Sequence, residues 1–88
     1  MIFRITGTVV GLLDRGFLLH TGDGEPITVT TQTAGCDLGL NAGDTVEVLG
    51  GPAGRATFAS STAFKVLPSG RSIEVPVNAW RPPRERPD

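Results

Sequence analysis

The sequence has little of what most chemical sites are built from. Among its 88 residues there is one cysteine, one histidine and no tyrosine. Cys36 cannot form an internal disulfide, and no second cysteine exists for a CxxC pair or a Cys/His metal site. We therefore expect no metal, no structural disulfide and a reducing compartment.

The sequence has no long apolar run, and we expect no leader segment. The first six residues, Met1 to Thr6, already have the pattern of a strand, without a charged leader or a small-residue cleavage site. No apolar run approaches the roughly 20 residues that a membrane-crossing helix needs. We expect a soluble, cytoplasmic protein that makes no contact with a membrane.

The sequence also lacks an excess of charge of either sign. Eight Lys and Arg stand against nine Asp and Glu, which gives a net charge of −1. General nucleic-acid binders usually carry a basic excess, so a strong phosphate-driven affinity is not expected. The residues Asp14, Asp23, Asp37 and Asp44 fall in predicted turns, where aspartate commonly bonds its own backbone. No nucleophile is paired with a base, and the sequence predicts a binding protein without enzymatic activity or a cofactor.

Glycine and alternating apolar residues are abundant, and both indicate strands joined by tight turns. Twelve glycines and 39% apolar residues predict an all-β fold, and 88 residues are enough for one domain. Strands are expected over residues 2–13, 16–21, 26–32, 44–50 and 55–67, and a sixth over 71–78. The inward side chains are expected to be Phe3, Ile5, Val9, Phe17, Leu19, Ile27, Val29, Val46, Val48, Ile73, Val75 and Val77.

The sequence also makes predictions for two connecting segments and for the last strand. Residues 33–43 allow at most one helical turn around Cys36 to Leu40, with Leu38 and Leu40 closing one end of the barrel. The run from Gly50 to Gly54 is interpreted as a flexible hairpin loop, and Arg55 after it as a phosphate contact. The sixth strand is expected at a sheet edge, because Pro76 cannot donate a ladder hydrogen bond.

The C-terminal end differs in composition from the rest. Residues 1–78 are predicted to be the domain, and residues 79–88 a proline-rich, charged and disordered tail. Trp80, at the start of this tail, is expected to be the most exposed aromatic ring, either folded back on the barrel or anchoring a protein partner. The edge strand and this tail together are a possible surface for a partner.

The order of the strand and turn motifs resembles bacterial OB-fold domains over residues 3–67. The motifs are Thr6-Gly7-Thr8-Val9-Val10, Gly16-Phe17-Leu18-Leu19, Gly22-Asp23-Gly24 with Ile27-Thr28-Val29, and Gly43-Asp44-Thr45-Val46-Glu47-Val48-Leu49-Gly50. The resemblance implies a five-stranded OB-type barrel, with the sixth strand added at an edge. It also implies a ligand groove across strands two and three, flanked by the first and fourth connecting loops.

On this sequence the implied groove is lined by Arg15, Leu18, His20, Thr28, Thr30, Gln32 and Arg55, with Arg4 near it. The strand from 16 to 21 has an ambiguous register, and placing Phe17 and Leu19 inside buries more apolar area and leaves Leu18 and His20 outside. The function that the resemblance implies is non-enzymatic binding of single-stranded nucleic acid. Fold analogy alone supports that function.

Two alternatives stay open. The segment from Ile27 to Val46 also resembles the Mop and TOBE domains, OB-like barrels that bind oxyanions such as molybdate, although the sequence departs from their pattern after Leu49. The other alternative is a protein-interaction module that acts through the Pro76 edge strand and the Trp80 tail.

Overall fold

The computed structural model describes residues 2–22 and 24–78 of the chain. The described part is all-β, with six strands and one short 3-10 helix. The elements are β1 (Phe3–Leu13), β2 (Gly16–His20), β3 (Ile27–Thr30), η1 (Gly35–Asp37), β4 (Thr45–Gly54), β5 (Thr57–Val66) and β6 (Ser72–Val75). No helix among the described residues is long and apolar enough to cross a membrane. The predictions for Trp80 and the 79–88 tail lie outside the described residues.

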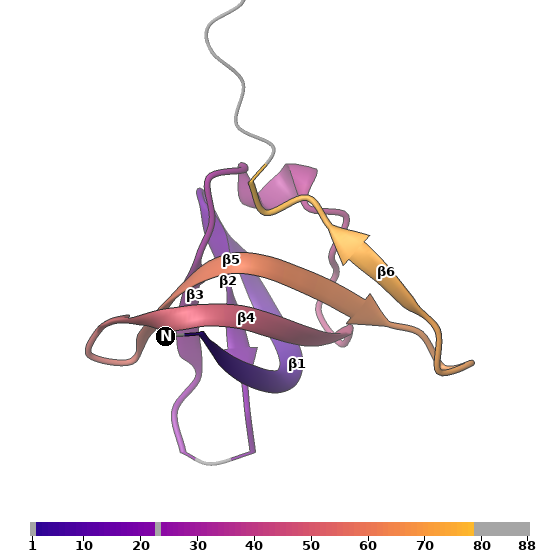
Figure 1. The fold of residues 1–88 in the computed structure, drawn as a ribbon, viewed down its shortest axis with the longest axis horizontal. Helices are drawn as coiled ribbons and strands as arrows, with labels where there is room; N and C mark the ends of the chain where they lie inside the picture. The colour runs from indigo at the N-terminus through magenta and orange to yellow at the C-terminus, as the bar shows by residue number, and fades with distance from the viewer. Residues whose placement is uncertain (1, 23, 79–88) are drawn as a thin grey trace, which may run out of the picture.

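The strands form one sheet that returns on itself. The sheet has the order β3-β2-β1-β4-β5-β6, and β3 also pairs with β5. The β3–β5 pairing is parallel, whereas all other pairings are antiparallel. Each of the strands β1 to β5 therefore has a neighbour on both sides. In the described chain β6 pairs with β5 alone, so the prediction of an edge strand is confirmed (Figure 1).

The core consists of the side chains that alternate toward the inside. Phe17 and Leu19 are fully buried, while Leu18 is half-buried and His20 is exposed, which confirms the predicted register of the second strand. The core also holds Val9, Val29, Leu38, Leu40, Val46, Val48, Phe58, Ala63, Val75 and Val77, with Ile5 and Ile27 packed against it. The helical turn after β3 was expected, and its neighbours Leu38 and Leu40 are buried as predicted.

The interpretation of Gly50 to Gly54 as a loop is wrong. These residues continue β4, where Pro52 lies opposite Phe58 of β5, and the turn to β5 contains only Arg55 and Ala56. A proline is tolerated here because β1 begins opposite Gly50, so the outer edge of β4 has no partner beyond that residue. The apparent turn composition therefore belongs to the unpaired end of a long hairpin.

Two apolar side chains expected inside are exposed. Phe3 is 47% exposed, because it is the first residue of β1 and lies opposite Gly50, which has no side chain to cover it. Ile73 is 50% exposed on the short edge strand. The last strand is also shorter than predicted, since it ends at Val75, directly before Pro76.

Candidate binding face

The outward-facing residues of β2, β3 and β5 form two rows that cross all three strands. Leu18 of β2 lies opposite Thr28 of β3, which lies opposite Thr57 of β5. The second row consists of Gly16, Thr30 and Ala59. The side chains in these rows face outward because their chain neighbours Phe17, Val29 and Phe58 are buried, whereas Gly16, which has no side chain, is itself buried. We call these six residues, together with His20, the outer strip.

The hydroxyl groups of the outer strip differ in what they contact. The Thr30 hydroxyl donates to the Phe58 carbonyl at 3.5 Å, and the Thr57 hydroxyl donates to the Arg55 carbonyl at 3.0 Å. The Thr28 side chain has no hydrogen-bond partner among the described residues, although its backbone N–H donates to the Ala56 carbonyl at 2.9 Å. The Thr28 hydroxyl can therefore donate to and accept from a ligand without losing an internal bond.

Two arginines lie at opposite ends of β3. Arg15, in the β1–β2 turn, accepts the Thr31 N–H at its carbonyl and donates from its guanidinium to the Gln32 carbonyl at 3.2 Å. Arg55 is in the β4–β5 turn, next to Ala56, which accepts the Thr28 N–H. Thr28 is near the start of β3 and Thr31 directly follows its last residue, so the two exposed arginine residues lie beyond opposite ends of this strand.

His20 lies at the Arg55 end of this strip. It follows Leu19, which pairs with Ile27 at the start of β3, and it lies opposite Thr8 of β1. Its side chain is exposed and has no hydrogen-bond partner among the described residues. An imidazole in this position can exchange hydrogen bonds with a polar ligand as donor or acceptor.

Arg4 and Gln32, which were expected at the groove, are placed differently. Arg4 lies on the part of β1 that pairs only with β4, and its guanidinium donates to the Glu47 carboxylate at 2.8 Å. The hydrogen bond and the charge of Glu47 raise the pKa of Arg4 above its ordinary value. Gln32 lies beyond the end of β3 and forms its hydrogen bonds through backbone groups. Its carbonyl accepts from the Arg15 guanidinium, and its N–H donates to the Val77 carbonyl.

Sequence reasoning missed the β5 part of the strip. Thr57 and Ala59 join it only because β5 pairs with β3 in parallel, and a pairing between strands so distant in sequence leaves no local signal. Apart from His20, the outer strip contains no aromatic side chain, since Phe17 and Phe58 are buried. Among the described residues, no group of three His, Cys, Asp or Glu side chains could hold a metal ion.

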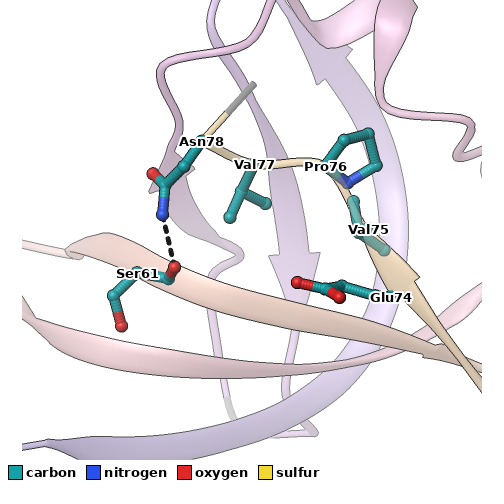
Figure 2. Close-up of a pocket in the computed structure, with 6 residues that line it drawn as sticks. All are labelled: Ser61, Glu74, Val75, Pro76, Val77 and Asn78. Carbon is teal, nitrogen blue, oxygen red and sulfur yellow. Dashed lines mark hydrogen bonds between the residues drawn. The ribbon is translucent and has the colours of Figure 1, made fainter. Parts of the chain in front are cut away.

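Other hollows lie outside the strip. A groove of about 890 Å³ runs between the β1–β2 turn and η1, lined by Leu12, Leu13, Asp14, Arg15, Ala34 and Cys36. We call it the turn groove. A smaller hollow of about 360 Å³ lies between β5 and the chain after β6 (Figure 2). There the Asn78 side-chain amide donates to the Ser61 carbonyl at 2.6 Å and joins the two segments.

Comparison of the chain with protein-family models, with curated proteins and with solved structures found no match. The geometry of the strip and of the turn groove therefore carries the functional argument. The strip offers threonine hydroxyl groups, the imidazole of His20 near its Arg55 end, and an arginine beyond each end of β3.

Proposed function

We propose that the protein is an OB-type barrel that binds single-stranded nucleic acid on the outer strip. The cyclic pairing order β1-β2-β3-β5-β4, with β3 and β5 parallel, supports the barrel. The observation that carries the function is the strip itself, with Arg15 at one end of β3 and Arg55 at the other. Each guanidinium suits a phosphate, and Thr28 and His20 suit polar groups on sugar or base.

The composition of the strip supports weak and sequence-tolerant binding. Base stacking on aromatic rings contributes roughly 1–3 kcal/mol per base in strong single-strand binders, and this strip has no phenylalanine, tyrosine or tryptophan ring, only the smaller imidazole of His20. Two phosphate contacts on a single strand correspond to a salt slope of about −1.4 in a plot of log K against log salt concentration. We expect measurable affinity at low salt and little at physiological salt.

The test is a titration of a fluorescently labelled deoxythymidine oligonucleotide, followed by anisotropy at several salt concentrations. Arg15→Ala and Arg55→Ala are each expected to weaken binding and to halve the salt slope, to about −0.7. Arg4→Ala is the matched control, because it removes the same charge from a guanidinium that is paired with Glu47. It should change the affinity much less.

Two results would contradict the proposal. The first is the absence of oligonucleotide binding at low salt, and the second is an equal loss of affinity in all three arginine variants. A parallel titration with molybdate, followed by amide chemical shifts, separates the oxyanion alternative. If the amide resonances shift on addition of molybdate but not on addition of the oligonucleotide, the oxyanion alternative is favoured.

A protein-interaction role is the second candidate, and the position of β6 favours it. One edge of β6 has no strand beside it in the described chain, and Ile73 on this strand is 50% exposed. An unpaired strand edge is a template for an added strand. Replacing Ser72 by proline would block such pairing and leave oligonucleotide binding unchanged, so this single variant distinguishes the two functions.

A further inference from the structure

The outer face of the barrel continues from the outer strip onto β1. The first row of the strip extends to Gly11, which lies opposite Leu18, and the second row extends to Leu13, which lies opposite Gly16. Paired residues of neighbouring antiparallel strands direct their side chains to the same face of a sheet. Leu13 therefore belongs to the face that carries the outer strip, and it is 36% exposed there.

A bulge in β1 adds a second aliphatic side chain to this face. The pairing of β1 with β2 shifts between Val9 and Gly11, which leaves Val10 as an extra residue without a partner of its own. Val9 is 1% exposed and Val10 is 46% exposed, so Val10 points away from the core. In a bulge two residues oppose one residue of the partner strand, and here Val10 and Gly11 lie opposite Leu18.

Val10, Leu13 and Leu18 form an apolar surface on β1 and β2, which we call the apolar flank. A Cβ on Gly11 would lie 3.6 Å from a Leu18 methyl carbon, so the half-buried Leu18 side chain extends over this glycine toward β1. Leu13 is two residues further along β1 and therefore diagonal to Leu18, a spacing that long side chains bridge. An exposed apolar patch that is rimmed by polar residues typically marks a binding site.

The other half of the outer face, on β3 and β5, is polar. Next to Leu18 the row continues with Thr28 and Thr57, and the Thr28 hydroxyl has no partner among the described residues. Arg55 lies beyond one end of β3, and Arg15 directs its guanidinium to the segment after the other end. The outer face is thus divided along the strands into an apolar half and a hydroxyl-bearing half with an arginine beyond each end.

We propose, on the basis of the proposed nucleic-acid binding, that the bases of a bound single strand lie on the apolar flank and that the flank favours thymine among the pyrimidines. The sugar-phosphate backbone then follows the polar half from Arg55 to Arg15, where guanidinium and hydroxyl groups suit phosphate and sugar oxygens. The bases extend to the side over Leu18 and Val10. This division of the ligand matches the division of the surface.

Thymine is favoured because it presents the most apolar surface of the pyrimidines. Its C5 methyl group is recognised by apolar contact with aliphatic side chains, and uracil and cytosine lack this methyl. No hydrogen-bond readout is needed, so the order of bases along the strand matters little. The flank therefore adds a preference for base composition to binding that is otherwise sequence-tolerant.

The test compares deoxythymidine and deoxyuridine oligonucleotides of the same length and label, which differ only in the C5 methyl groups. In anisotropy titrations at low salt we expect the deoxythymidine ligand to bind about fourfold more tightly, which corresponds to ~0.8 kcal/mol for one buried methyl group. Val10→Thr and Leu18→Thr should each bring the ratio of the two affinities toward one. Ile73→Thr is the matched control, because it replaces an exposed aliphatic residue on β6, and it should leave the ratio unchanged.

The outcomes separate this proposal from the proposed function. If neither oligonucleotide binds, both are overturned. If both ligands bind wild-type protein with equal affinity, nucleic-acid binding stands and the role of the flank is overturned. A ratio that both flank variants leave unchanged also overturns it, since another surface would then contact the methyl group.

A measurement on the wild-type protein keeps the proposal testable if a flank variant unfolds. The side-chain methyl resonances of Val10, Leu13 and Leu18 should shift more with the deoxythymidine ligand than with the deoxyuridine ligand, while those of Ile73 stay in place. An abasic oligonucleotide should shift the Thr28 amide and leave the flank methyl resonances unchanged. Shifts of the flank methyl groups with the abasic ligand would overturn the proposed orientation, because backbone rather than bases would then cover the flank.

Discussion

The Ser60 hydroxyl donates a hydrogen bond to the Thr30 carbonyl at 2.8 Å, and this bond joins β5 to β3. The two strands pair through three residue pairs only, from Thr28 with Thr57 to Thr30 with Ala59. The bond therefore supports the shortest contact in the cycle of strands, and the outer strip depends on that contact. Loss of the bond should lower the free energy of unfolding and weaken ligand binding on the outer strip.

The first prediction concerns Ser60. Ser60→Ala removes the donor from the Thr30 carbonyl and should lower the free energy of unfolding by about 1 kcal/mol. Ser72→Ala on the exposed edge strand is the control and should stay within about 0.5 kcal/mol of wild type. Urea unfolding measures both values. Equal effects of the two substitutions would show that the hydroxyl contributes nothing to the β3–β5 contact.

The second prediction compares two strand glycines. At Gly50 a Cβ would overlap the carbonyl oxygen of Ala59 in the paired strand, whereas at Gly11 the nearest atom would be a Leu18 methyl at 3.6 Å. Gly50→Ala should therefore destabilise the protein by roughly 1–3 kcal/mol, because backbone must move. Gly11→Ala should be neutral or slightly stabilising. Thermal unfolding of the two variants checks the difference, and a neutral Gly50→Ala would contradict the close approach of β4 and β5.

Local patterning was sufficient to predict the strands and most of the core. The alternation around Phe17 and Leu19 gave the correct register because each apolar side chain that turns inward removes a large area from water. It failed at Phe3, where the partner position holds Gly50, and a missing side chain in another strand leaves no trace in the local sequence.

The same limit applies to the candidate site. Leu18, His20, Thr28 and Thr30 were placed on one face by alternation alone, and the structure does bring them together. Arg4 was not separable from the other arginines by sequence, because its ion pair with Glu47 depends on the pairing of β1 with β4. The contribution of β5 likewise depends on a long-range parallel pairing.

The third prediction separates the tail from the segment before it. Residues 81–88 contain no large apolar side chain, so their deletion should leave the melting temperature nearly unchanged. Deletion from residue 76 onward is the comparison, since it also removes buried Val77 and its bond to Gln32. This longer deletion should cost roughly 2 kcal/mol or more. A drop of many degrees on removal of 81–88 alone would contradict the domain boundary at residue 78.

The last prediction concerns two polar residues, His20 and Gln32, that were both expected at the groove. The structure places only His20 there. His20 is exposed on the outer strip, whereas Gln32 lies beyond the end of β3 and uses only its backbone. Both are exposed, so His20→Ala and Gln32→Ala should each change the free energy of unfolding by less than about 0.5 kcal/mol. Only His20→Ala should weaken oligonucleotide binding in the anisotropy titration, because only its side chain faces the strip. If the two variants bind the oligonucleotide with equal affinity, the His20 side chain is not part of the binding site. A loss of about 2 kcal/mol of stability in His20→Ala would show that the imidazole is packed or hydrogen-bonded, and the strip would then lack a free group at its Arg55 end.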